Sequence, residues 1–469
     1  MEKILGVRFL LWTMILLVFN LIALSAQSDS SNVLTYQEYL ENIVSFHPIA
    51  KKADLKILSA KAELLGAKGN LDPMIVSDWN EKNFGDKLYF RQYQAKLKFP
   101  TKFGFDLVGG YENSEGVFLN PENKTDDLGL WHLGIEIDVF QGLLVNERKA
   151  ILEQAQVFQN LADNERQIIL NDLIYIASIA YLNWQQFEYS KVVLTESKSI
   201  AQQYFNNTKQ SFFSGEKTAM DTLEALLLSQ DATTLIQKNE LGLIKSRQRV
   251  ENFLWYDDLP ISLQEETKPE DVRKPILPTL DAFENLSLVD HPILLSTINK
   301  LSYLEIEQKL KRSKMRPKFK VKYNPLLATS PNSISPSFSL NDYKFGIDLS
   351  MPLLLRSARA NARKGELKIK EVELDLENKR NQLMNKIEGS WLQQVVLREQ
   401  LILLEQNVES YKLLLDGESE KYNFGESSVF LLNKRQEKYI NGQLKLVETF
   451  VKQQLELLNC LYFSNQLVN

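Results

Sequence analysis

The chain has 469 residues, of which 44% are hydrophobic and 25% are charged, a composition typical of folded, water-soluble proteins. This composition excludes an intrinsically disordered chain and a polytopic helical transporter. The 55 Lys and Arg residues against 60 Asp and Glu residues give a formal charge of -5, so no basic field favours nucleic acid as a partner. The single cysteine, Cys460, excludes an intrachain disulfide and a cysteine-based zinc site.

The N-terminus has the pattern of a secretory signal. Two basic residues precede an apolar run of about 16 residues that ends at Leu24, and small residues follow at Ser25 and Ala26. A transmembrane helix needs about 18 to 20 apolar residues, so the pattern favours a signal peptide over residues 1–26. No stretch from about residue 28 onward is apolar enough to cross a membrane as a helix, and we expect any spanning to be done by strands.

An internal repeat organises the chain. Residues 47–49 (His-Pro-Ile) recur at residues 291–293, and further matches follow in the same order along both halves. Their common order predicts a first repeat over residues 27–255, a linker over residues 256–278 and a second repeat over residues 279–469. The first repeat holds about 32 extra residues in the stretch before its long helix.

Both repeats predict the same order of elements: strands, a very long helix, a glycine turn and another long helix. The helical segments lack proline and space their apolar residues by three and four, so we expect coiled-coil seams such as Ile169, Leu173, Ile176 and Ala180. At 1.5 Å per residue the longest helices reach roughly 100 Å, and we expect such rods to self-associate. The predicted elements are strands over about residues 73–140, helices over about 145–213 and 216–255, strands over about 317–352, and helices over about 357–422 and 425–463.

The strand segments alternate between apolar and polar side chains. In residues 131–139 the odd positions are apolar and the even positions are polar or small, and residues 343–351 repeat the pattern. Segments of about ten residues with one apolar, aromatic side suit a barrel that faces lipid outside and water inside. A sheet that covers a soluble core is the alternative. The residues we expect to face lipid are Trp131, Leu133, Ile135, Ile137, Phe345, Ile347 and Leu349.

An exported, duplicated chain with strands between very long helices resembles the outer-membrane efflux proteins of the TolC family. The resemblance covers most of the mature chain, and its local marks are residues 350–356 (Ser-Met-Pro-Leu-Leu-Leu-Arg) and the turns at Gly215 and Gly425. It implies an α+β membrane protein that forms a homotrimer. The strands of all copies would then join one transmembrane β-barrel in the lipid of the Gram-negative outer membrane, and the helices would form an α-barrel through the periplasm. The family has two strands per repeat, so the extra residues of the first repeat predict a further hairpin over about residues 88–111.

The resemblance also implies a periplasmic adaptor and an inner-membrane transporter as partners at the helical end of the tunnel. Phenylalanine beside glycine in a helix turn suits contact with another coiled-coil tip, whereas a packed aromatic at a helix end is the alternative. The adaptor-docking tips that we expect are Phe213, Ser214, Gly215, Glu216, Asn423, Phe424, Gly425 and Glu426.

Asp416, Glu418 and Glu420 form a short acidic segment before the second of these turns. By resemblance to the family's acidic constriction, three copies of this gate would ring the pore, favour cations and raise one another's pKa values. A solvated, charged helix face is the alternative.

The sequence contains no motif that indicates catalysis. His47 and His291 occupy equivalent helix starts, where we expect capping, and His132 lies in a predicted strand. No phosphate-binding loop, dinucleotide-binding, HExxH or GxSxG pattern occurs, so we expect no enzyme, cofactor or metal site. The function we expect is a passive outer-membrane exit duct of a tripartite efflux or type I secretion system. A structural coiled-coil protein of the cell envelope, without a pore, is the alternative.

Overall fold

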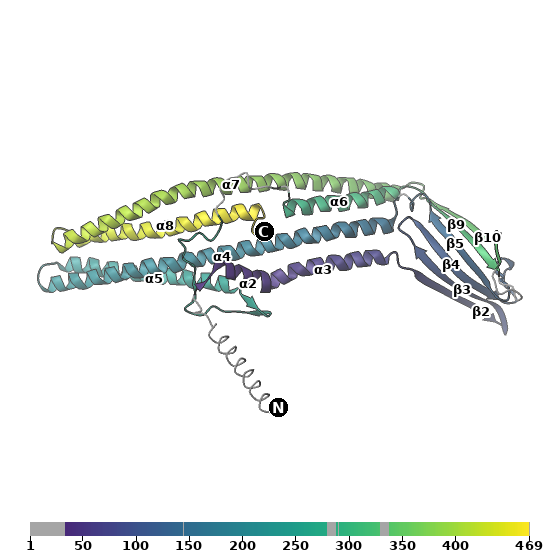
Figure 1. The fold of residues 1–469 in the computed structure, drawn as a ribbon, viewed down its shortest axis with the longest axis horizontal. Helices are drawn as coiled ribbons and strands as arrows, with labels where there is room; N and C mark the ends of the chain where they lie inside the picture. The colour runs from purple at the N-terminus through teal and green to yellow at the C-terminus, as the bar shows by residue number, and fades with distance from the viewer. Residues whose placement is uncertain (1–32, 144, 279–287, 289, 329–336, 469) are drawn as a thin grey trace, which may run out of the picture. The chain divides into compact units, whose positions relative to one another are not determined.

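The structure is a computed structural model, shown in Figure 1. It describes residues 33–143, 145–278, 288, 290–328 and 337–468. The signal peptide expected at residues 1–26 and the expected start of the second repeat at residue 279 lie outside the described residues. The elements in chain order are β1 (Val33–Leu34), α2 (Tyr36–Phe46), α3 (Pro48–Gly69), β2 (Met74–Phe84), β3 (Lys87–Pro100), β4 (Phe105–Glu115), the 3-10 turn η1 (Pro121–Asn123), β5 (Leu130–Asp138), α4 (Glu147–Phe213), α5 (Ala219–Glu251), β6 (Trp255–Tyr256), β7 (Leu259–Pro260), β8 (Lys268–Pro269), α6 (Pro292–Ser313), β9 (Lys318–Ala328), β10 (Ser337–Ser350), α7 (Arg356–Asn423) and α8 (Val429–Phe463).

The chain divides into two compact units. We call them the helical unit, formed by Met1–Lys51, Leu170–Leu286 and Lys386–Asn469, and the sheet unit, formed by Lys52–Ile169 and Ser287–Asn385. The two longest helices, α4 with 67 residues and α7 with 68, contribute to both units. The predicted α+β class, with very long helices and a sheet, is confirmed.

The sheet unit contains a six-stranded antiparallel sheet in the order β10-β9-β5-β4-β3-β2. The first repeat supplies four strands and the second supplies two, and β5 pairs with β9 so that Ile135 lies opposite Tyr323. The hairpin β3–β4 includes the residues where the sequence placed an additional hairpin. The helices α3, α4, α6 and α7 all meet the same end of this sheet, because each precedes or follows one of its strands (Figure 1).

Two histidines explain where the leading helices α3 and α6 begin. His47 Nδ1 accepts a hydrogen bond from the amide of Ile49 at 3.2 Å, and His291 Nδ1 accepts one from Ile293 at the same distance. The capping role predicted for both residues is confirmed. Burial lowers the pKa of His47, which keeps Nδ1 available as an acceptor at neutral pH.

The core of the helical unit is built around α4. Tyr39 and Tyr181 are fully buried there, and their rings stack with centroids 5.4 Å apart. The Tyr181 hydroxyl donates to Leu34 O at 2.7 Å and accepts from the amide of Glu270 at 3.1 Å. These bonds hold the parallel pair β1–β8 against α4. The linker expected over residues 256–278 is therefore partly ordered structure that packs on this unit through β8.

The buried stripe of α4 differs from the expected seam at one position. Leu173 and Ala180 are buried as predicted, but Ile176 is 55% exposed and lies outside the stripe that is buried within one copy. The buried positions instead pass through Ala177, which lies one residue further along. An apolar spacing of three and four indicates a stripe, but a second apolar residue beside the stripe fits the same spacing.

Candidate functional site

The six-stranded sheet has two chemically different faces. Side chains alternate along each strand, and the cross-strand register aligns these alternations over the sheet. On β5 the odd residues, such as Leu133, lie on what we call the outer face, and the even residues, such as Glu136, lie on the inner face. The outer face includes Ile347 of β10, and the inner face includes Lys98 of β3.

The outer face gathers the residues that the sequence assigned to lipid. Ile135 of β5 lies opposite Tyr323 of β9, which in turn lies opposite Phe345 of β10. Six of the seven predicted residues are exposed and Ile137 is half-buried. The register therefore brings the apolar positions of both repeats onto one surface.

A row of aromatic rings crosses the outer face over four adjacent strands, with neighbouring ring centroids 4.9 to 6.4 Å apart. The rings belong, in strand order, to Trp79, Tyr93, Tyr111 and Trp131. On the side of this row away from the helices, Arg91 forms ion pairs with Glu81 at 2.7 Å and Glu115 at 2.6 Å. The row therefore marks the point where the apolar surface gives way to charge.

A second aromatic group lies at the end of the sheet that joins the helices. The rings of Phe103 and Phe105 lie 6.3 Å apart, and those of Phe140 and Phe319 lie 5.5 Å apart. The apolar outer face is therefore bounded by aromatic side chains at both ends. This pattern is typical of strands that cross a bilayer, where aromatic residues sit at the two interfaces.

The inner face carries ion pairs. Lys98 Nζ lies 2.9 Å from Asp106 and 3.3 Å from Glu136, and Arg148, in the first turn of α4, reaches Asp106 at 2.5 Å. Lys322 pairs with Asp348 at 2.9 Å. Sequence reasoning missed these pairs because they join different strands, although the alternating lysines of β9 indicated a charged face.

The sheet curls around its inner face. Lys344 on β10 forms an ion pair with Glu112 on β4, although β5 and β9 lie between these strands. At the helical end, a cavity of about 740 Å³ opens between the sheet, the start of α4 and the end of α6, and its lining includes Lys318 and Lys320. A curled sheet with charges inside and apolar residues outside has the pattern that is typical of a wall between water and lipid.

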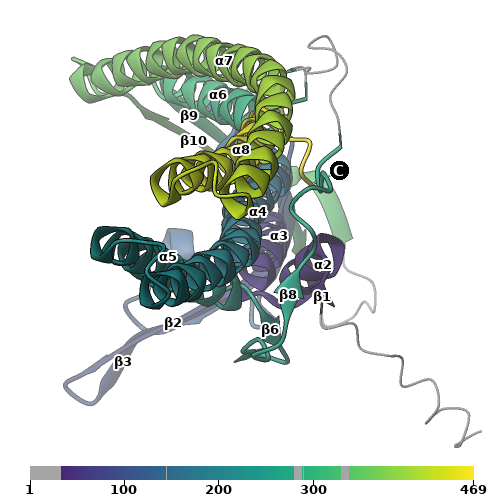
Figure 2. The same ribbon diagram turned by 90° about the vertical axis from the view of Figure 1, so that its left-hand side faces the viewer.

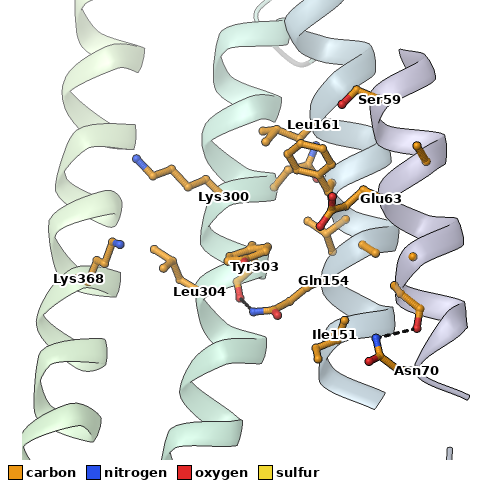
Figure 3. A pocket seen from close by; sticks show the side chains of 17 residues that line it. Ser59, Glu63, Asn70, Ile151, Gln154, Leu161, Lys300, Tyr303, Leu304 and Lys368 are labelled. Carbon is orange, nitrogen blue, oxygen red and sulfur yellow. Dashed lines mark hydrogen bonds between the residues drawn. The ribbon is translucent and has the colours of Figure 1, made fainter. Parts of the chain in front are cut away.

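A second cavity of about 930 Å³ lies between the helices of the sheet unit (Figure 3). Ile151, Leu161 and Leu304 line it, and Gln154 Nε2 donates to Tyr303 O at 3.5 Å. The described residues contain no cluster of three His, Cys, Asp or Glu side chains able to hold a metal ion. The cavity is a gap in helix packing, lined mainly by apolar groups.

Two matching turns end the long helices. Gly215 and Gly425 adopt φ of +77° and +78°, and in each turn the glycine and the following glutamate donate back to the last helical residues at 3.0 and 2.9 Å. This is the Schellman motif, in which glycine adopts the left-handed conformation without a steric penalty. Phe213 is 76% exposed and Phe424 is 81% exposed, so both tips present an uncovered aromatic ring.

The two tips lie side by side within the helical unit (Figure 2). The hydroxyls of Thr208 and Tyr422 are 3.3 Å apart, those of Tyr204 and Ser419 are 3.4 Å apart, and Lys217 Nζ lies 5.0 Å above the Tyr422 ring. These contacts join the hairpin α4–α5 to the hairpin α7–α8. The two tips that carry the predicted docking residues are therefore neighbours.

The three residues of the acidic segment before the second tip have different surroundings. Glu418 accepts a hydrogen bond from Ser427 Oγ at 2.5 Å and lies 3.6 Å from Arg435. The hydrogen bond from Ser427, followed by the charge of Arg435, lowers the pKa of Glu418. The rise expected for a ring of acidic side chains concerns repulsion between copies and stays a prediction. Asp416 and Glu420 are exposed.

Among the described residues, no helix is long and apolar enough to cross a membrane. A scan against protein-family models and a search of curated proteins find no match to this chain.

Solved structures do match. The CmeC outer membrane channel of Campylobacter jejuni aligns with a TM-score of 0.65 and 12% identity over 92% of this chain and 85% of CmeC. The outer membrane protein VceC of Vibrio cholerae aligns with a TM-score of 0.66 and 11% identity over 92% and 95% of the two chains. The MtrE outer membrane channel of Neisseria gonorrhoeae aligns with a TM-score of 0.63 and 13% identity over 92% and 88%.

The chain has the fold of these outer-membrane channels. The fold that the resemblance to the TolC family predicted is thereby confirmed, with a departure in the first repeat, which carries four strands where the family has two.

The tip geometry predicts a difference between two glycines of the second repeat. Gly425→Ala places a side chain in the left-handed region, so we expect a loss of about 1–2 kcal/mol of stability. Gly417→Ala, in the interior of α7 where an added Cβ meets nothing within 4 Å, should be neutral or stabilising. The thermal unfolding midpoint of each purified variant measures the difference. Equal midpoints would show that the turn does not require its left-handed residue.

Proposed function

We propose that the chain is a passive exit duct in the outer membrane of a Gram-negative cell envelope. It conducts substrates that an inner-membrane transporter delivers, across the periplasm and the outer membrane, in a tripartite efflux or type I secretion system. The observation that carries this proposal is the two-faced sheet, with an apolar outer face between two aromatic groups and an ion-paired inner face.

The sheet chemistry matches the two solvents of a membrane conduit. Lipid accepts apolar side chains such as Leu133 and Ile347 but provides no partner for a charge, and aromatic rings prefer the interfaces. Charges on the inner face, such as Lys98 and Asp106, need water or a counter-ion. One strand therefore supplies both surfaces through its alternation of side chains.

In the proposed homotrimer, neighbouring copies cover apolar helix surfaces that one copy leaves exposed. Within the sheet unit, Leu55 and Leu65 on α3 and Leu367 and Leu374 on α7 are exposed large apolar residues. Rows of apolar residues on long helices are stable only when another helix covers them. We propose that neighbouring copies provide these helices, and the number three follows from the resemblance to the TolC family.

The tips suit docking of a periplasmic adaptor. Phe213 and Phe424 are large, exposed rings on rigid turns, which is the chemistry of an interface anchor. We place the adaptor contact at the eight tip residues, Phe213 to Glu216 and Asn423 to Glu426, with the inner-membrane transporter beyond it.

We propose that the three acidic residues of the gate have different roles. Three copies of the exposed Asp416 and Glu420 would supply negative charge to the pore and favour cations. Glu418 would act differently, because its bonds to Ser427 and Arg435 brace the α7–α8 hairpin.

Two adjacent residues of β10 test the membrane position of the sheet. Ile347 lies on the outer face, and a lysine there should cost about 2–4 kcal/mol per copy at the bilayer centre. We therefore expect Ile347→Lys to reduce sharply the amount of assembled protein in outer-membrane fractions. Gly346→Lys is the matched control, because Gly346 lies on the inner face and an added Cβ there meets nothing within 4 Å. Equal yields of both variants would contradict the exit duct and favour a coiled-coil scaffold without a pore.

The tips are tested by Phe213→Asp combined with Phe424→Asp. Removing two aromatic anchors should weaken docking by about 2–4 kcal/mol, so dye efflux from cells should fall towards that of the deletion strain. Channel conductance of the purified variant in planar bilayers should stay unchanged. Val117→Asp, at an apolar residue that is 76% exposed in the loop after β4, is the control. Normal efflux by the double variant would remove the tips from the docking surface.

A further inference from the structure

Within the part of the chain that the structure describes, β2 and β10 are the edge strands of the sheet, and each pairs with a neighbouring strand on one side only. All eleven residues of β2 are exposed, and Ile75 and Trp79 are 79% and 61% exposed. An unprotected edge of this length is a template for pairing with another strand. Both edges therefore need a partner strand.

The directions of the two edges are complementary. Each strand of the sheet is antiparallel to its neighbour, and the sheet has six strands, so β2 and β10 run in opposite directions. When β2 of one copy meets β10 of the next, the pair is antiparallel as well. A three-fold rotation that relates the copies then closes the sheets into one barrel. Every strand of that barrel is antiparallel to both of its neighbours, as in bacterial outer-membrane barrels.

The additional hairpin β3–β4 is built into the wall of the sheet. Its Asp106 is bound by Arg148 of α4, and Asn146 Nδ2 at the start of α4 donates to Lys102 O in the hairpin turn at 2.9 Å. A Cβ on Gly104 in that turn would lie 2.1 Å from Gly142 O, so the turn packs directly against the passage from β5 to α4. The hairpin cannot fold away without losing these contacts.

We propose that three copies of this chain close a barrel of eighteen strands, in which β2 of each copy pairs with β10 of the next. The proposal rests on the trimeric duct described above and concerns its width. Four strands per copy, as in the TolC family, would give twelve. With strands about 4.8 Å apart and tilted by about 40°, eighteen strands give a backbone diameter of about 36 Å and twelve give about 24 Å. The additional hairpin therefore widens the outlet.

One register satisfies both faces of the new strand pair. With Asp78 opposite Lys344 on the inner face, Ile75 lies opposite Ile347 and Trp79 opposite Tyr343 on the outer face. Opposite charges and apolar pairs directly across strands each stabilise a sheet. Within one copy Lys344 contacts Glu112, and on pairing it can serve both carboxylates, because an ammonium has three donors.

Cysteine cross-linking of the full-length protein in membranes tests this pairing. The variant with Ile75→Cys and Ile347→Cys should run mainly as a covalent trimer on denaturing gels after oxidation. The control pair, Ile75→Cys with Leu133→Cys, should stay monomeric, because β5 is already paired on both sides. A cross-linked monomer would overturn the proposal, because β2 would then pair with β10 of its own chain.

Electron microscopy of the unmodified protein, extracted from membranes and viewed along its axis, measures the width independently. A three-fold ring about 36 Å across at the barrel supports eighteen strands. A three-fold ring about 24 Å across would overturn the wide barrel and leave the exit duct intact. Particles without three-fold symmetry would overturn both the trimeric duct and its width.

Discussion

Alternation of side chains along six antiparallel strands is the constraint on which the rest of the molecule depends. Over residues 131–138 of β5, 318–324 of β9 and 343–350 of β10, every second residue is apolar and the residues between are charged, polar or glycine, so the sheet has two faces that suit different solvents. The backbone of such a wall needs every N–H and C=O paired, since lipid offers no hydrogen bonds. Among the described strands, β3, β4, β5 and β9 pair on both sides, whereas β2 and β10 pair on one side only, and the proposed association of copies would pair these two edges.

The helices follow from the same duplication. Each repeat places a leading helix, α3 or α6, before its first strand and a long helix after its last, so the helices emerge from one end of the sheet. In each repeat a Schellman turn then reverses the chain, with nearly equal φ at Gly215 and Gly425. Because both turns expose a phenylalanine, duplication yields two similar tips, which together form the proposed docking surface.

Periodicity predicted the elements well where a pattern is local. The long helices, the strand alternation and the glycine turns all follow from the spacing of residues close in sequence. The failures occur where the outcome depends on distant residues. Ile176 fits the seam spacing but lies beside the buried stripe, because other helices decide which stripe is covered. The sequence did not predict that the linker pairs with β1, because the two residues of β8 are too few to show the alternation of a strand.

The candidate site shows the same division. The exposed tips and the outer face could be read from the sequence, since glycine turns and alternation are local. The ion pairs of Lys98 with Asp106 and Glu136 depend on the order β3-β4-β5, which the sequence does not state. Glu418 was grouped with Asp416 and Glu420 because they are neighbours in sequence, yet its partners Ser427 and Arg435 come from beyond the turn.

The most direct test of the two-solvent wall is a cysteine scan over residues 344–349 of β10 in proteoliposomes, read by reaction with a water-soluble maleimide. The native Cys460 gives little background, because burial raises the pKa of its thiol to about 12. Cysteines at positions 344, 346 and 348 should react quickly through the water-filled interior, and those at 345, 347 and 349 should be shielded by lipid. Equal rates at all six positions would contradict a wall between lipid and water.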